Sequence, residues 1–142
     1  MDVMAKQVEK PINITRFDHI QMDVGNIEES LDFYRRVFGF QVKEIGLRAL
    51  VRWCIVGNDA KLYLCMHELA SGVGVPNKGL KITHFGLLVD DFETVERRLR
   101  DFGVPMVYEH PVQYHSSRSI YFFDPNGYKI EISEFNGGGI DP

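Results

Sequence analysis

The sequence predicts an α+β fold built from two successive βαβββ modules. The first observation is an internal repeat, because residues 17–40 and 82–104 each run from a strand-like segment with a histidine in third place to an amphipathic helix that ends at Phe-Gly. The second is that three strand-like runs follow each of these helices. The two copies keep their register, since His19 and His84 are 65 positions apart.

The composition fits one domain or two small fused halves. Of the 142 residues, 44% are hydrophobic and 25% are charged, which is enough to build a core. The net charge of −4 argues against nucleic acid as a partner. No apolar run approaches the ~18 residues of a membrane helix, and residues 1–14 form a polar lead-in without a signal-peptide core. Two cysteines in apolar runs indicate reduced thiols, so we expect a cytoplasmic protein.

The first module is expected to span residues 15–69. Its helix has Asn26 as the predicted N-cap and Gly39 as the predicted C-cap, with apolar residues at helical spacing between them. The three strands that follow are predicted over residues 40–47, 50–56 and 61–67.

The second module is expected to span residues 80–135, after a Gly- and Pro-rich linker over 70–79. Asp90 or Asp91 is the predicted cap of its helix, and Gly103 the predicted stop. Its later strands are predicted over 105–113, 118–124 and 128–135, with the turn Asp-Pro-Asn-Gly between the last two and a tail over 136–142.

Glu131 stands between two isoleucines in the last predicted strand. Strand side chains alternate between faces, so Ile130 and Ile132 face a helix and Glu131 faces away from it. The same alternation places His19 and His84 on the non-helix faces of the first strands of the two modules. If these faces turn toward each other, two imidazoles and one carboxylate can bind one divalent metal ion (Fe, Zn, Ni, Mn or Co) with open positions for substrate.

Paired modules containing "DHI", "THFG" and "YFFDPNGYKIEI" resemble the vicinal oxygen chelate superfamily over about residues 15–135. This superfamily includes glyoxalase I, methylmalonyl-CoA epimerase, fosfomycin-resistance thiol transferases, extradiol dioxygenases and bleomycin-resistance proteins. The resemblance implies a half-open mixed β-barrel with the helices outside. It also implies His19, His84 and Glu131 as metal ligands, and a homodimer whose site lies within one chain or is shared across two.

The resemblance leaves the reaction open. Cys65 aligns with Glu131 at the family's fourth ligand position, and His67 is the other candidate there. The missing glutamate weakens the match to glyoxalase I and the epimerases, which are expected to use four protein ligands and a carboxylate near the metal as general base. Gln21 stands where the fosfomycin branch has a threonine. Tyr121 fits the extradiol signature, but the upstream His115 stands one or two residues too close.

We therefore expect a metal-dependent enzyme that chelates neighbouring oxygens of a small substrate, with lyase or isomerase chemistry favoured. One alternative is an Fe(II) extradiol ring-cleaving dioxygenase. Another is a metal-free, bleomycin-like binding protein that holds a planar ligand against aromatic side chains. The expected substrate contacts are Gln21, Trp53, Arg118 and Phe123, and the expected catalytic groups are Tyr121 and His115.

Overall fold

The computed structural model describes residues 16–70 and 82–135 of the chain. The expected lead-in and tail, and all but the first residue of the expected linker, lie outside the described residues. The first module comprises β1 (Ile20–Val24), α1 (Ile27–Phe38), β2 (Gln41–Arg48), β3 (Val51–Gly57) and β4 (Tyr63–Glu68). The second comprises β5 (Phe85–Leu88), α2 (Phe92–Asp101), β6 (Val112–Gln113), β7 (Arg118–Phe123) and β8 (Lys129–Ser133).

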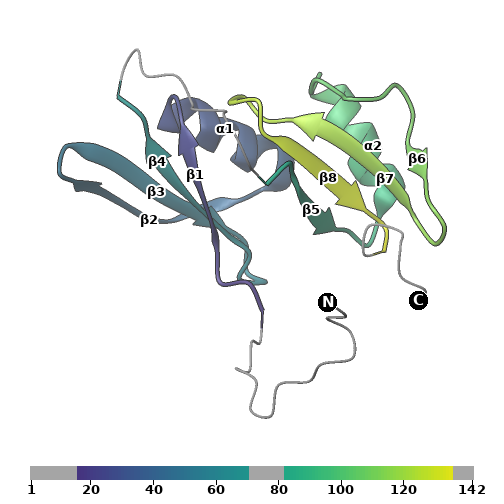
Figure 1. Ribbon diagram of the computed structural model, residues 1–142, viewed down its shortest axis with the longest axis horizontal. Coiled ribbons are helices and arrows are strands. Elements are labelled where there is room, and N and C mark those ends of the chain that lie inside the picture. The colour runs from purple at the N-terminus through teal and green to yellow at the C-terminus, as the bar shows by residue number, and fades with distance from the viewer. Residues whose placement is uncertain (1–15, 71–81, 136–142) are drawn as a thin grey trace, which may run out of the picture.

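Each module forms one four-stranded mixed sheet, in the orders β1-β4-β3-β2 and β5-β8-β7-β6. The first strand pairs in parallel with the last, and the other pairs are antiparallel. The sheets stay open, and both helices lie behind them in the view of Figure 1. The predicted fold class, two βαβββ modules with the helices outside, is confirmed. None of the described helices has the length and apolar character that crossing a bilayer requires.

Both helices begin and end where local chemistry dictates. The Asn26 side chain accepts a hydrogen bond from the Glu29 amide at 2.9 Å, and Gly39 ends α1 at φ 69°. Of the two candidates for the second cap, Asp91 is the cap, since it accepts from the Thr94 amide at 3.2 Å. Gly103, at φ 68°, follows the end of α2.

The predicted strand over residues 105–113 is wrong. Only Val112–Gln113 forms a strand there. Pro105 and Pro111 carry no amide hydrogen, so neither can donate to a sheet ladder. The Pro105 carbonyl does accept from the Phe123 amide at 3.0 Å, so the segment touches β7 at its start and then leaves the sheet until β6.

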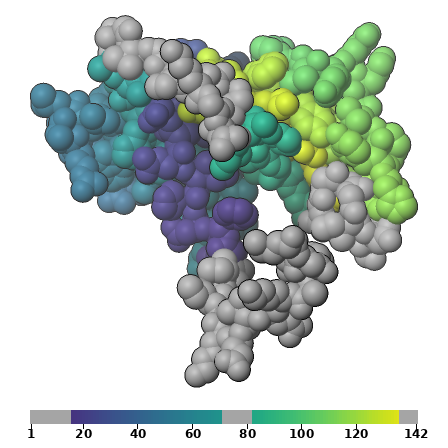
Figure 2. Space-filling view, viewed as in Figure 1, coloured from purple at the N-terminus to yellow at the C-terminus, as the bar shows by residue number. Residues whose placement is uncertain are grey.

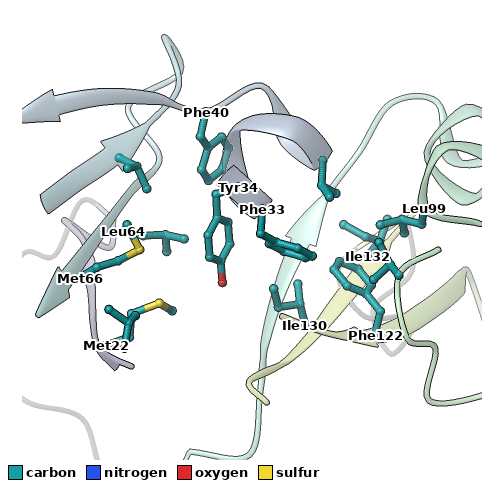
Figure 3. Packing of buried hydrophobic residues seen from close by; sticks show 14 of the residues in the cluster. Met22, Phe33, Tyr34, Phe40, Leu64, Met66, Leu99, Phe122, Ile130 and Ile132 are labelled. Carbon is teal, nitrogen blue, oxygen red and sulfur yellow. The ribbon is translucent and has the colours of Figure 1, made fainter. Parts of the chain in front are cut away.

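One hydrophobic core runs through both modules. In Figure 3, Phe33 and Tyr34 of α1 lie between the first-module side chains Met22 and Leu64 and the second-module side chain Ile130. Apart from Phe33, which is 6% exposed, and Met22, at 5%, the side chains named here are at most 1% exposed. Helix α1 therefore packs against both halves and joins their interiors.

The turn between β7 and β8 also ties the halves together. The buried Tyr34 hydroxyl donates to Asp124 at 2.9 Å, and burial raises the pKa of Tyr34 well above its usual value. The Asn126 amide group donates to the Ser30 hydroxyl and accepts from the Gly25 amide, both at 2.9 Å. A turn in the second module thus binds the start and middle of α1.

An arginine ties each helix to its own sheet. It binds one glutamate in the first turn of the helix and another at the end of the last strand of the module. These triads occupy equivalent positions in the repeat and are Arg52 with Glu28 and Glu68, and Arg118 with Glu93 and Glu134.

Candidate functional site

Glu131 lies on the face of its sheet that is turned away from α2. Ile130 and Ile132 are fully buried in the core, whereas Glu131 points the other way and is 7% exposed. The alternation predicted for the last strand is therefore confirmed. Gly86 is its partner on β5, so no side chain at that position covers the carboxylate.

The carboxylate of Glu131 has a partner for each oxygen. Oε1 lies 3.0 Å from Nε2 of His84, which directly precedes β5. Oε2 accepts a hydrogen bond from the Ser119 hydroxyl at 2.7 Å, in a buried environment. The structure thus brings together two of the three predicted metal ligands and adds Ser119, which holds the carboxylate in place.

In both predicted histidine ligands, Nδ1 contacts the side chain of the preceding residue. Nδ1 of His84 lies 3.0 Å from the Thr83 hydroxyl, and Nδ1 of His19 lies 2.7 Å from a carboxylate oxygen of Asp18. Metal-binding histidines commonly hold one ring nitrogen in this way, which orients the other toward the ion. In both modules the nitrogen left for a metal is therefore Nε2.

A cavity of about 540 Å³ connects the two histidines. It is lined by the starts of β1 and β5, and His19, Gln21 and His84 all contribute to its wall. Figure 2 shows the surfaces of these two segments, purple and teal, beside one another on the face toward the viewer. Gln21 therefore lies where it could contact a molecule bound in this cavity, and its substrate role stays a prediction.

His19 shares the cavity but does not complete the set within one chain. It is half exposed, and no three His, Cys, Asp or Glu side chains among residues 16–70 and 82–135 converge as a metal site would require. The donor atoms of His84 and Glu131 fit a metal ion, because they converge at 3.0 Å on a partly buried face.

Tyr121 stands directly across from Glu131 in the β7–β8 pairing. Its ring packs edge-on with the rings of His84 and Tyr108, each at 5.7 Å, and its hydroxyl lies 2.6 Å from that of Tyr114. Burial, the Tyr114 hydrogen bond and the charge of Glu131 raise the pKa of Tyr121 well above its usual value. Tyr121 is thus a neutral phenol beside the His84–Glu131 pair.

Three of these neighbours were not predicted. Ser119 could have been found, since it lies two residues before Tyr121 and therefore shares its face. Tyr108 lies within the wrongly predicted strand over 105–113 and Tyr114 directly follows it, so alternation along the sequence carried no information about their direction.

The other predicted contacts lie away from the His84–Glu131 pair. Arg118 sits on the helix side, where its guanidinium binds two glutamates and lies 4.6 Å from the centre of the Phe92 ring. His115 is exposed in the β6–β7 turn, and Phe123 is half buried at the end of β7. Arg118 occupies the position in the second module that Arg52 occupies in the first. The repeat could therefore have indicated that both arginines lie on the helix side and bind glutamates.

Trp53 lies flat on the inner face of the first module. A β-carbon at Gly46 would stand 2.4 Å from the indole ring, so the ring occupies space that only glycine leaves open. Trp53 is half buried, and its expected contact with substrate stays a prediction.

Cys65 occupies the position equivalent to Glu131. It pairs with Gln21 across β1 and β4, just as Glu131 pairs with Gly86 across β5 and β8. Its sulfur lies 3.5 Å from Nε2 of His67, and burial raises the pKa of the thiol. The predicted alignment is confirmed, and this module presents a neutral thiol where the other presents a carboxylate.

Two curated relatives are similar to this chain along most of its length. A lactoylglutathione lyase from Escherichia coli O157:H7 is 27% identical over 129 residues, covering 87% of this chain and 96% of the relative. A protein described as "Glutathione transferase FosA" from Serratia marcescens is 25% identical over 119 residues, covering 81% and 77%.

Solved structures share the fold. A glyoxylase/bleomycin resistance protein/dioxygenase domain from Frankia sp. EAN1pec superposes with a TM-score of 0.75 at 13% identity, covering 85% of this chain and 98% of that one. The fosfomycin resistance protein FosX from Listeria monocytogenes gives 0.64 at 21% identity, covering 85% and 93%. The family model of the Glyoxalase/Bleomycin resistance protein/Dioxygenase superfamily matches residues 16–132, and the chain belongs to this superfamily.

Proposed function

We propose that the protein is a metal-dependent enzyme of lyase or isomerase type that acts on a small substrate with two neighbouring oxygens. The observation that carries this proposal is the convergence of His84 Nε2 and Glu131 Oε1 at 3.0 Å. His19, His84 and Glu131 would hold one divalent ion, either Fe, Zn, Ni, Mn or Co. When bound, that ion would supply Lewis acidity toward the substrate oxygens.

The remaining residues of the site hold and orient groups. Ser119 fixes one oxygen of Glu131 and leaves the other facing His84. Gln21 offers an amide to the substrate from the cavity wall. The similarity to lactoylglutathione lyases supports lyase chemistry, and the neutral phenol of Tyr121 supplies a hydrogen-bond donor close to His84.

Metal titration tests the proposal directly. Protein stripped with a chelator should bind about one equivalent of Zn, Ni or Co per chain in calorimetry, and His84→Ala should lose this binding because one of two converging donors is gone. The exposed His110 provides the matched control, and His110→Ala should bind as wild type. Absence of binding to the wild-type protein would refute the proposal and favour the metal-free binding protein.

We further propose that a second copy of the chain completes the site. The edge strand β2 and the turn after it leave apolar side chains in solvent, with Ile45 65%, Leu47 66% and Leu50 92% exposed. Exposed apolar patches of this kind are typical of interfaces. In such a homodimer, His19 of one chain would meet His84 and Glu131 of its partner.

A mixing experiment distinguishes a shared site from a site within one chain. His19→Ala and His84→Ala homodimers should each fail to bind metal. After unfolding and refolding together, mixed dimers should regain one intact site each, so that roughly a quarter of all sites bind metal. A site contained in one chain would give no recovery.

The dioxygenase remains a second candidate because of Tyr121. Its ring contacts His84 and its hydroxyl belongs to a pair of phenols beside Glu131. Elemental analysis of protein purified without added metal separates the two candidates. Iron, together with oxygen uptake in the presence of catechol, would favour ring cleavage; nickel or zinc would favour the lyase or isomerase.

A further inference from the structure

Two lysines, Lys61 and Lys129, line the cavity that contains His19 and His84. Among the described residues that line it, Asp18 is the sole carboxylate, and it is hydrogen-bonded to His19 at 2.7 Å. The wall of this cavity is therefore cationic, although the chain as a whole carries a net charge of −4.

Neither lysine is neutralised by an ion pair within residues 16–70 and 82–135. Lys129 has its ammonium group 6.0 Å from the centre of the Tyr121 ring, on the side of the candidate metal ligands. By contrast, Lys43 lies 3.6 Å from a carboxylate oxygen of Asp59. The charges of Lys61 and Lys129 are thus available to a ligand in the cavity.

The backbone at Lys61 adopts a conformation that favours glycine. Lys61 lies in the β3–β4 turn at φ 61°, and its amide donates to the Asn58 carbonyl at 3.2 Å. The equivalent β7–β8 turn has Gly127 at φ 90°, and its amide donates to the Asp124 carbonyl at 3.0 Å. The first module therefore carries a long cationic side chain at a position where L-residues are disfavoured.

We propose that Lys61 and Lys129 form an oxyanion subsite that binds a carboxylate, phosphate or phosphonate group of the ligand. Lysine ammonium groups bind such oxyanions as compact point charges. Since both lysines line the same cavity as His84, and Lys129 lies beside the Tyr121 ring that packs on His84, the bound anion would lie beside the His84–Glu131 pair. The inference deepens the proposed function by making the substrate a small anion, and it rests on that function only for the identity of the neighbouring metal.

The test uses metal-free full-length protein, so that it does not depend on metal binding. Pyruvate, methylphosphonate and the uncharged analogue acetone are titrated while amide shifts are followed by NMR. We expect saturable shifts at the cavity residues with one or both anions and none with acetone. A preference for pyruvate identifies a carboxylate subsite, and a preference for methylphosphonate identifies a phosphonate or phosphate subsite.

Lys61→Gly and Lys129→Gln should each weaken anion binding about three- to fivefold, as expected for the loss of one partly exposed charge contact. Lys43→Ala is the matched control and should bind as wild type. Lys61→Gly should also melt no lower than wild type, because glycine is favoured at this backbone conformation, so lost affinity cannot come from unfolding.

Two outcomes would overturn the subsite. One is that neither anion gives saturable shifts in the wild-type cavity. The other is that Lys61→Gly and Lys129→Gln bind the anions as tightly as wild type does. The metal affinity of the same variants should equal that of the wild type. Failure of the anion subsite can therefore be distinguished from failure of the metal site.

Discussion

The two modules share one scaffold and differ on their inner faces. Both have a side-chain cap on the helix, an arginine bound to two glutamates, and a histidine just before the first strand. On the inner faces, the second module has Gly86, Ser119 and Glu131. The first module has Gln21, Trp53 and Cys65 at the corresponding positions, so an amide, an indole and a thiol replace the glycine, the hydroxyl and the carboxylate.

This difference indicates a division of roles within a duplicated fold. The second module brings a carboxylate, a serine hydroxyl and an imidazole together in a partly buried place. The first module brings an indole and a thiol to the equivalent positions, and the thiol of Cys65 lies 3.5 Å from Nε2 of His67. Under the proposed function, the second module would supply two of the three metal ligands and the first would shape the space for the substrate.

The largest expected effect is a difference in metal affinity between substitutions of the equivalent residues Glu131 and Cys65. Glu131→Gln should lower metal affinity by more than about 100-fold, because it removes a charged ligand whose oxygen faces His84. Cys65→Ser should leave the affinity within about threefold, because the one possible ligand that the thiol contacts in the described part of the chain is His67. Calorimetric titration with Zn or Co gives both values. A large loss of metal affinity in Cys65→Ser would instead indicate that both modules contribute metal ligands.

The next effect concerns the serine that holds the carboxylate. Ser119→Ala should lower metal affinity by about 10-fold, in the range seen when a hydrogen-bond partner of a ligand is removed. The melting temperature of the metal-free variant shows whether folding is intact. If affinity is unchanged while the variant stays folded, Ser119 does not position Glu131.

A smaller effect should follow from making the second module resemble the first at position 86. Gly86→Gln should reduce metal affinity several-fold, because the side chain would extend over the carboxylate. Gly86→Ala is the control, since a β-carbon there would lie 3.9 Å from Glu131, an ordinary contact. Equal titration curves for the two variants would show that access from β5 is unimportant.

The smallest effect concerns the two arginine triads and their pH dependence. The Arg52 hydrogen bond lowers the pKa of Glu28 to about 2, so the stability this contact contributes is present above pH 4.5 and is lost as the pH falls toward 2. Arg52→Ala should therefore be slightly less stable at pH 7, and its deficit should shrink across this interval in denaturant unfolding.

Arg118→Ala provides the comparison for that measurement. Arg118 lowers the pKa of Glu93 and Glu134, and its guanidinium also packs on Phe92. Part of its deficit should therefore persist at low pH, because the ring contact does not titrate. A deficit that vanishes equally in both variants would show that the ring contact adds nothing.

Local sequence signals predicted the fold well. The caps at Asn26 and Gly39 and the alternation around Glu131 were correct because each depends on neighbouring residues. The strand predicted over 105–113 was wrong. Its apolar residues suggested a strand, but Pro105 and Pro111 cannot donate hydrogen bonds to a sheet.

The candidate site was only partly predictable. The meeting of His84 with Glu131 follows from pairing the first and last strands of one module. The position of His19 depends on how two modules, or two chains, are arranged, which no local pattern encodes. Arg118 was expected to contact substrate, but its partners lie on α2 and beyond β8, on the helix side of the sheet.

The contacts between Asp124, Asn126 and α1 also bear on how this duplicated chain folds. A repeated module can in principle be an autonomous folding unit, yet here the second half supplies the acceptor for the buried hydroxyl of Tyr34. A fragment that ended before β5 would leave that hydroxyl and one side of α1 without partners. We therefore expect the halves to fold in a single cooperative step, and a chain cut between them to regain structure only when both pieces are present.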